Sequence, residues 1–64
     1  MSNMVEIEVQ DQFGAWHYYT SVTNNPSSIK LALQTAIKTQ LASKSRRARA
    51  IDEKTGVLID MLQG

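Results

Sequence analysis

The chain has 64 residues, a net charge of +1 and no cysteine. This length predicts one domain spanning residues 1–64, near the lower limit for folding without a metal or a disulfide. The lack of cysteine excludes a disulfide framework and a thiolate-bound metal cluster. Because the apolar fraction, 42%, is slightly low for a globular chain, association into a homodimer would be a natural supplement to a thin core.

Nothing in the sequence predicts a membrane or secretory destination. No apolar run approaches the roughly 20 residues that a membrane-spanning helix needs. The first ten residues, MSNMVEIEVQ, lack the basic and apolar regions of a secretory signal. We therefore expect a soluble, cytoplasmic protein that does not bind a membrane.

The N-terminal third has the pattern of a β-hairpin. Val5, Ile7 and Val9 alternate with polar residues, which is the period of a half-buried strand. The tetrad DQFG at 11–14 is typical of a hairpin connection in which glycine supplies a positive φ. The aromatic and β-branched segment AWHYYTSV at 15–22 then predicts the returning strand.

A helix is predicted from Pro26 to about Ser43. Asn25 can cap its N-terminus, and proline is tolerated at the first helical position because the missing N–H is not needed there. The apolar residues at helical spacing form one face, which consists of Ile29, Leu33, Ala36, Ile37 and Leu41. Leu31 falls on the opposite, solvent-facing side.

A second hairpin follows the helix. The segment RRARAID at 46–52 alternates arginine with alanine and runs into a turn and an apolar segment, VLIDML at 57–62, so a strand is favoured over a free basic arm. We expect Ala48 and Ala50 to face the helix, because small side chains permit close approach. Val57, Ile59 and Met61 are expected to share one face of the last strand.

These elements predict an α+β fold of order β-β-α-β-β. The simplest assembly is a four-stranded, mainly antiparallel sheet with one helix packed on one face. One helix leaves the other face of the sheet uncovered. On that face we expect Glu6, Glu8, Arg47 and Arg49.

The second strand also contributes to the uncovered face, in one of two parities. Because Val22 shares parity with Trp16 and Tyr18, we expect those two aromatic residues to point inward and to form core. His17 and Tyr19 would then point outward. The opposite parity stays open at this point.

Two interpretations of the uncovered face remain open. In the first, Glu6 and Glu8 oppose Arg47 and Arg49 in a cross-strand charge ladder with no ligand, each pair contributing about 0.2–1 kcal/mol. In the second, the face binds a protein partner or a second copy, because tyrosine and arginine are enriched in interfaces. The expected partner-binding residues are His17, Tyr19, Arg47 and Arg49.

The charge distribution suggests an alternative function. No Asp or Glu occurs between Gln12 and Ile51, whereas basic residues cluster after the helix. These could form a weak, sequence-nonspecific nucleic-acid-binding edge that contacts phosphates, although dedicated binders usually have a more basic chain. The residues concerned are Lys38, Lys44, Arg46, Arg47 and Arg49.

The sequence favours a protein that is not an enzyme. His17 is the only histidine, and no metal-ligand spacing or phosphate-binding glycine loop is present. The serines stand in loop or helix-end positions where backbone capping explains them. We therefore expect no catalytic residues, no metal and no cofactor, and predict a small non-catalytic interaction module that acts through the uncovered face or an edge strand.

Overall fold

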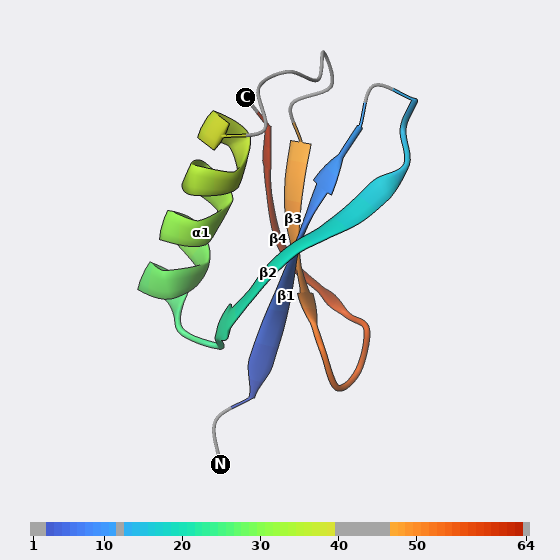
Figure 1. The fold of residues 1–64 in the computed structure, drawn as a ribbon. Coiled ribbons are helices and arrows are strands. Elements are labelled where there is room, and N and C mark those ends of the chain that lie inside the picture. The colour runs from blue at the N-terminus through green and yellow to red at the C-terminus, as the bar shows by residue number, and fades with distance from the viewer. Residues whose placement is uncertain (1–2, 12, 40–46, 64) are drawn as a thin grey trace.

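The computed structural model describes residues 3–11, 13–39 and 47–63. The elements are β1 (Met4–Gln10), β2 (Trp16–Thr23), α1 (Pro26–Thr39), β3 (Arg47–Asp52) and β4 (Leu58–Gln63). The strands form one antiparallel sheet of order β2-β1-β3-β4, and α1 lies along one side of it (Figure 1). The predicted α+β class and the β-β-α-β-β order are confirmed.

The helix begins where the sequence predicts. Asn25 Oδ1 accepts the backbone N–H of Ser27 at 2.9 Å, which satisfies one of the donors left over at a helix N-terminus. The described helix ends at Thr39, so the predicted end near Ser43, and Leu41 with it, lie outside the described residues. Leu31 is exposed, as expected. Among the described residues, no helix is long and apolar enough to cross a bilayer.

The core lies between α1 and the two central strands. Ile7 pairs with Ala50 across the β1–β3 ladder, and Val9 pairs with Ala48. Ala48 and Ala50 are fully buried, which confirms that the small residues of β3 face the helix. The whole buried cluster consists of Val5, Ile7, Ile29, Leu33, Ala36, Ala48 and Ala50. Two alanines in the middle of the sheet allow one short helix to contact all four strands.

Both hairpin turns are organised by an aspartate. Asp11 Oδ1 accepts the backbone N–H groups of Phe13 and Ala15, and its carbonyl accepts the N–H of Gly14. Gly14 has a φ of +89°, a conformation that glycine adopts without steric cost. The β3–β4 turn repeats this pattern with Asp52 and with Gly56, whose φ is +76°.

A β-bulge in β2 overturns the predicted parity of its aromatic residues. Ile7 pairs with Thr20 but Glu8 pairs with Tyr18, so Tyr19 is the extra residue and the alternation reverses there. Tyr18 is therefore exposed on the side away from α1, whereas Tyr19 packs against the core. The prediction that Trp16 and Tyr18 point inward and Tyr19 outward is wrong, because alternation cannot be carried across a bulge.

A second bulge changes the facing of β4. Ala50 pairs with Asp60 but Ile51 pairs with Leu58, which makes Ile59 the extra residue. Leu58 and Met61 consequently share the side of the sheet that carries Arg49 and Ile51, and Leu62 packs against the core. The expected single face of Val57, Ile59 and Met61 is therefore wrong for the same reason.

The close approach of α1 to β3 can be tested by adding volume beneath the helix. Ala50→Leu should lower the free energy of unfolding by about 1–3 kcal/mol, because a filled core accommodates extra methylene groups only by straining its neighbours. Ala15→Leu makes the same chemical change at an exposed turn residue and should stay within about 0.5 kcal/mol of the native chain. Urea denaturation followed by circular dichroism measures both. Equal effects of the two substitutions would contradict the packing described.

Candidate functional site

The sheet face opposite α1, here called the outer face, is the candidate site. Strand register and alternation place side chains from all four strands on it. Several are large, apolar and exposed: Tyr18 is 62% exposed, Leu58 50%, Met61 44% and Met4 39%. No described element covers this face (Figure 1). An uncovered face bearing large apolar side chains is a typical binding surface.

The centre of the outer face is held by an ion pair and a ring contact. Arg49 Nε donates to Glu8 Oε1 at 2.6 Å, and the Arg49 guanidinium carbon lies 4.2 Å from the centre of the Trp16 ring. Arginine over an indole face is the preferred cation–π geometry. Because Trp16, Glu8 and Arg49 come from β2, β1 and β3 respectively, three strands are joined by side chains. Both charged side chains are half-buried.

The predicted charge ladder is only half correct. Glu8 opposes Arg49 as expected, but Glu6 opposes Ile51, and Arg47 pairs with Gln63 of β4. In an antiparallel ladder, moving along one strand means moving backwards along the other, so Glu6 and Arg47 diverge from the Glu8–Arg49 pair in opposite directions. Among the described residues, no ion pair involves Glu6 or Arg47.

The predicted partner-binding residues do not form one cluster. Arg47 and Arg49 lie on the outer face, as expected. His17 is exposed but pairs with Val9, which packs against the core, so its expected place on the outer face is wrong. Its Nε2 is hydrogen-bonded to Asp11 Oδ2 beside the first turn. Tyr19 packs against the core on the helix side. The residues that β2 contributes to the outer face are Trp16 and Tyr18 in place of His17 and Tyr19.

The aromatic and aliphatic residues of the outer face that sequence reasoning missed are Trp16, Tyr18, Leu58 and Met61. No strand-alternation signal could have found them, since β2 and β4 each contain a bulge that reverses the alternation within the strand. The structure shows one consequence of the first bulge: Tyr18 and Ser21, three residues apart, are hydrogen-bonded at 2.9 Å. In a regular strand, residues three apart point to opposite faces, so a hydroxyl pair at this spacing is compatible with a bulge.

The structure describes only part of the predicted nucleic-acid-binding cluster. Lys44 and Arg46 lie outside the described residues. Lys38 stands in the last turn of α1, and Arg47 is exposed at the start of β3. Arg49 is engaged by Glu8 and Trp16, so its charge is partly neutralised within the molecule.

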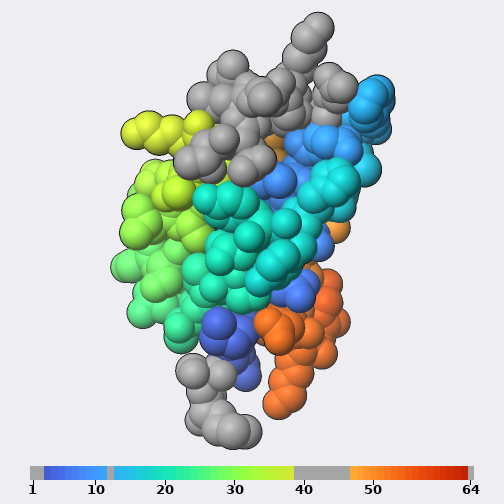
Figure 2. Space-filling model, in the orientation of Figure 1, coloured from blue at the N-terminus to red at the C-terminus, as the bar shows by residue number. Residues whose placement is uncertain are grey.

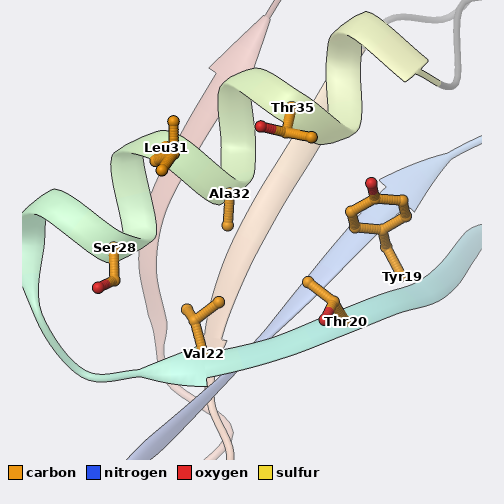
Figure 3. Close-up of a pocket in the computed structure, with 7 residues that line it drawn as sticks. All are labelled: Tyr19, Thr20, Val22, Ser28, Leu31, Ala32 and Thr35. Carbon is orange, nitrogen blue, oxygen red and sulfur yellow. The ribbon is translucent and has the colours of Figure 1, made fainter.

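A shallow groove of about 600 Å3 is lined by residues of α1 and β2. The side chains of these two elements lie next to one another in Figure 2. Figure 3 shows Val22 and Ala32 pointing toward one another across the groove, with Tyr19 and Thr20 on the β2 side. The bulge produces this arrangement, because it directs the adjacent Tyr19 and Thr20 toward the same side. The remaining lining residues, Ser28, Leu31 and Thr35, are helical. The described residues that line the groove carry hydroxyl groups and no carboxylate, amine or imidazole.

Asp11 is the titratable group whose environment is most clearly perturbed. The hydrogen bond from His17 and those from the Ala15 and Phe13 backbone lower the pKa of Asp11 below its ordinary value. All of these bonds favour the ionised carboxylate. Within the described parts of the chain, no group of three His, Cys, Asp or Glu side chains could hold a metal ion. The bonds from His17 and from the turn amides to Asp11 hold the β1–β2 turn in place, and this arrangement is here called the Asp11 clamp.

No protein-family model, no curated protein and no solved structure matches this chain.

The Asp11 clamp predicts a specific pH dependence. Because the pKa of Asp11 is lower in the folded than in the unfolded chain, its contribution to stability is present above the unfolded value, about 3.9, and is lost as the pH falls through the folded value. Carboxyl carbon NMR should show Asp11 titrating below its ordinary pKa. His17→Phe should raise that pKa, whereas Phe13→Ala, which keeps the backbone donor, should leave it unchanged. An ordinary Asp11 pKa in the native chain would refute the clamp.

Proposed function

We propose that this protein is a non-catalytic interaction module that binds a protein through its outer face. The observation that carries the proposal is the exposure of Tyr18, Leu58 and Met61 around the fixed Arg49–Trp16 pair. Aromatic residues, methionine and arginine are the types enriched in protein interfaces. This set comes from β2, β3 and β4, and the contact of Arg49 with Trp16 spans the intervening strand β1.

The contacts that side chains of the outer face make with one another further support a binding role. Ordering mobile side chains at an interface costs conformational entropy and lowers affinity. Arg49 is already held by Glu8 and by the Trp16 ring, and Tyr18 is already hydrogen-bonded to Ser21. A partner would therefore meet side chains whose positions are fixed before contact, which favours affinity at modest buried area.

The non-catalytic part of the proposal is supported by the role of His17. Its Nε2 is bonded to Asp11, and Asp11 Oδ1 is bonded to two turn amides. Among the described residues, His17 has no hydrogen bond to a serine, threonine or lysine side chain. A histidine that activates a nucleophile must reach one. This histidine instead stabilises a turn.

Nucleic-acid binding is retained as a second candidate because Arg47 is exposed and forms no ion pair with another described residue. Lys38, at the end of α1, is a second exposed cation. Against this role, Glu6 and Glu8 share the outer face with the arginines. Their charges would repel a phosphate backbone, so the protein-binding role is favoured.

The protein-binding role is tested by comparing surface variants in capture experiments. The immobilised chain should retain a discrete set of proteins from a native cell extract, or further copies of itself. Tyr18→Ser should weaken this retention by about 30-fold, the effect of losing roughly 2 kcal/mol at a central aromatic contact. Phe13→Ser is the matched control, because Phe13 is 84% exposed but lies in the β1–β2 turn. Retention that survives Tyr18→Ser and fails with Phe13→Ser would place binding elsewhere and refute the proposal.

The nucleic-acid candidate makes a separate prediction. Titration with a single-stranded oligonucleotide at low salt should shift the amide signals of Arg47 and its neighbours, and the effect should decline steeply as salt is raised. Arg47→Gln should weaken this binding more than Lys54→Gln, which removes an exposed charge in the β3–β4 turn. Unchanged spectra at low salt would eliminate this candidate.

A further inference from the structure

We infer that the outer face binds a second copy of the same face. The twofold axis lies in the interface between the two sheets, runs parallel to the strands and passes over the boundary between β1 and β3. The inference rests on the proposed function and names the partner for that surface. It comes from one line of side chains across the sheet, here called the central row: Tyr18 on β2, Glu8 on β1, Arg49 on β3 and Met61 on β4. The strand register pairs each member of the central row with the next.

The central row is complementary to itself when it is turned around. A twofold axis parallel to the strands and between β1 and β3 places each strand of one copy over its mirror position in the other, so β1 faces β3 and β2 faces β4. Glu8 then lies over Arg49 of the second copy, and Tyr18 lies over Met61 of the second copy. Both contacts occur twice, as they must in an isologous dimer.

The two kinds of contact have different roles. Methionine sulfur against an aromatic ring is favourable, and burial of Tyr18 and Met61 removes apolar surface from water. The four charges, Glu8 and Arg49 from each copy, alternate in sign, so each has an opposite charge beside it within its own sheet and another across the interface. Because desolvation offsets much of the attraction between such charges, they fix orientation more than they add affinity.

The other ways of joining two sheets are disfavoured by the same residues. A twofold axis perpendicular to the strands would place Glu8 over Glu8 and Arg49 over Arg49, which is repulsive in both cases. Pairing of two β4 edges is opposed by Asp60, a charge on an edge strand. Asp60 Oδ1 also accepts the backbone N–H of Met61 at 2.8 Å, so one backbone donor of the edge is already occupied.

The geometry of face-to-face packing makes the central row decisive. Packed sheets cross at about 30°, so side chains match best at the crossing point and diverge away from it. The neighbouring row contains Ser21, Glu6, Ile51 and Leu58, and it has no opposite charge to offer Glu6. Only the central row combines charge and apolar complementarity among the rows that the register describes in full across four strands.

A crosslinking experiment tests the orientation of the two copies. Because the chain has no cysteine of its own, only the introduced cysteines react. Tyr18→Cys and Met61→Cys chains are prepared separately, mixed and treated with a short bismaleimide. Position 18 of one copy and position 61 of the other lie about 10 Å apart across packed sheets, whereas the two copies of position 18 are also displaced sideways by three strand spacings, about 14 Å. Crosslinked heterodimer should dominate over both homodimers by intact mass. A mixture of Tyr18→Cys with Leu31→Cys, on the exposed side of the helix, should give only random products.

Sedimentation equilibrium of the native chain provides the second measurement. The mass should rise to twice that of the chain with concentration, and Met61→Glu should return it to the monomer value because it places a carboxylate over Tyr18 of the second copy. A monomeric native chain at every concentration, or homodimeric Tyr18→Cys crosslinks in excess, overturns this inference. Loss of protein capture on Tyr18→Ser with a monomeric native chain would refute the dimer while leaving the proposed function intact.

Discussion

The packing of one short helix against two alanines in the middle of the sheet determines the rest of this molecule. Ala48 and Ala50 are fully buried beside Ile7, and this lets α1 contact every strand. A single helix covers one face of a sheet and cannot cover both. All residues that alternate with the core therefore fall on the outer face, whatever their chemistry, and the surface that we propose as functional is a direct consequence of that packing.

The outer face resolves a conflict between charge and burial. Glu8 and Arg49 stand in the two central strands, where each is half-buried. A half-buried charge without a partner would be destabilising. The direct Glu8–Arg49 bond and the Trp16 ring over which Arg49 lies provide that partner. The same contacts remove Arg49 from the pool of cations available to a phosphate, which is why the basic segment is a weaker candidate than its composition indicates.

The fold could be predicted from local patterns because each element has an independent physical signature. Alternation defined β1 and β3, Asn25 and Pro26 defined the start of α1, and Asp11 and Asp52 defined the turns. The site could only be predicted in part. Arg47 and Arg49 were placed correctly because β3 pairs regularly with β1. Tyr18, Tyr19 and Met61 were not, because one extra residue in each hairpin exchanges the two faces, and a bulge leaves no mark on alternation before the strands are paired.

The order of the strands explains how such a face becomes complementary to itself. In the order β2-β1-β3-β4, the boundary between β1 and β3 divides the sheet into two hairpins with corresponding turns, one built on Asp11 and one on Asp52. A twofold axis at that boundary superimposes the position of one hairpin on the other. Each hairpin of one copy would then face the other hairpin of the second copy, so that acidic residues would meet basic ones and aromatic residues would meet aliphatic ones. The Glu8–Arg49 pair joins the hairpins within one chain, and the same opposition of charge would join two chains.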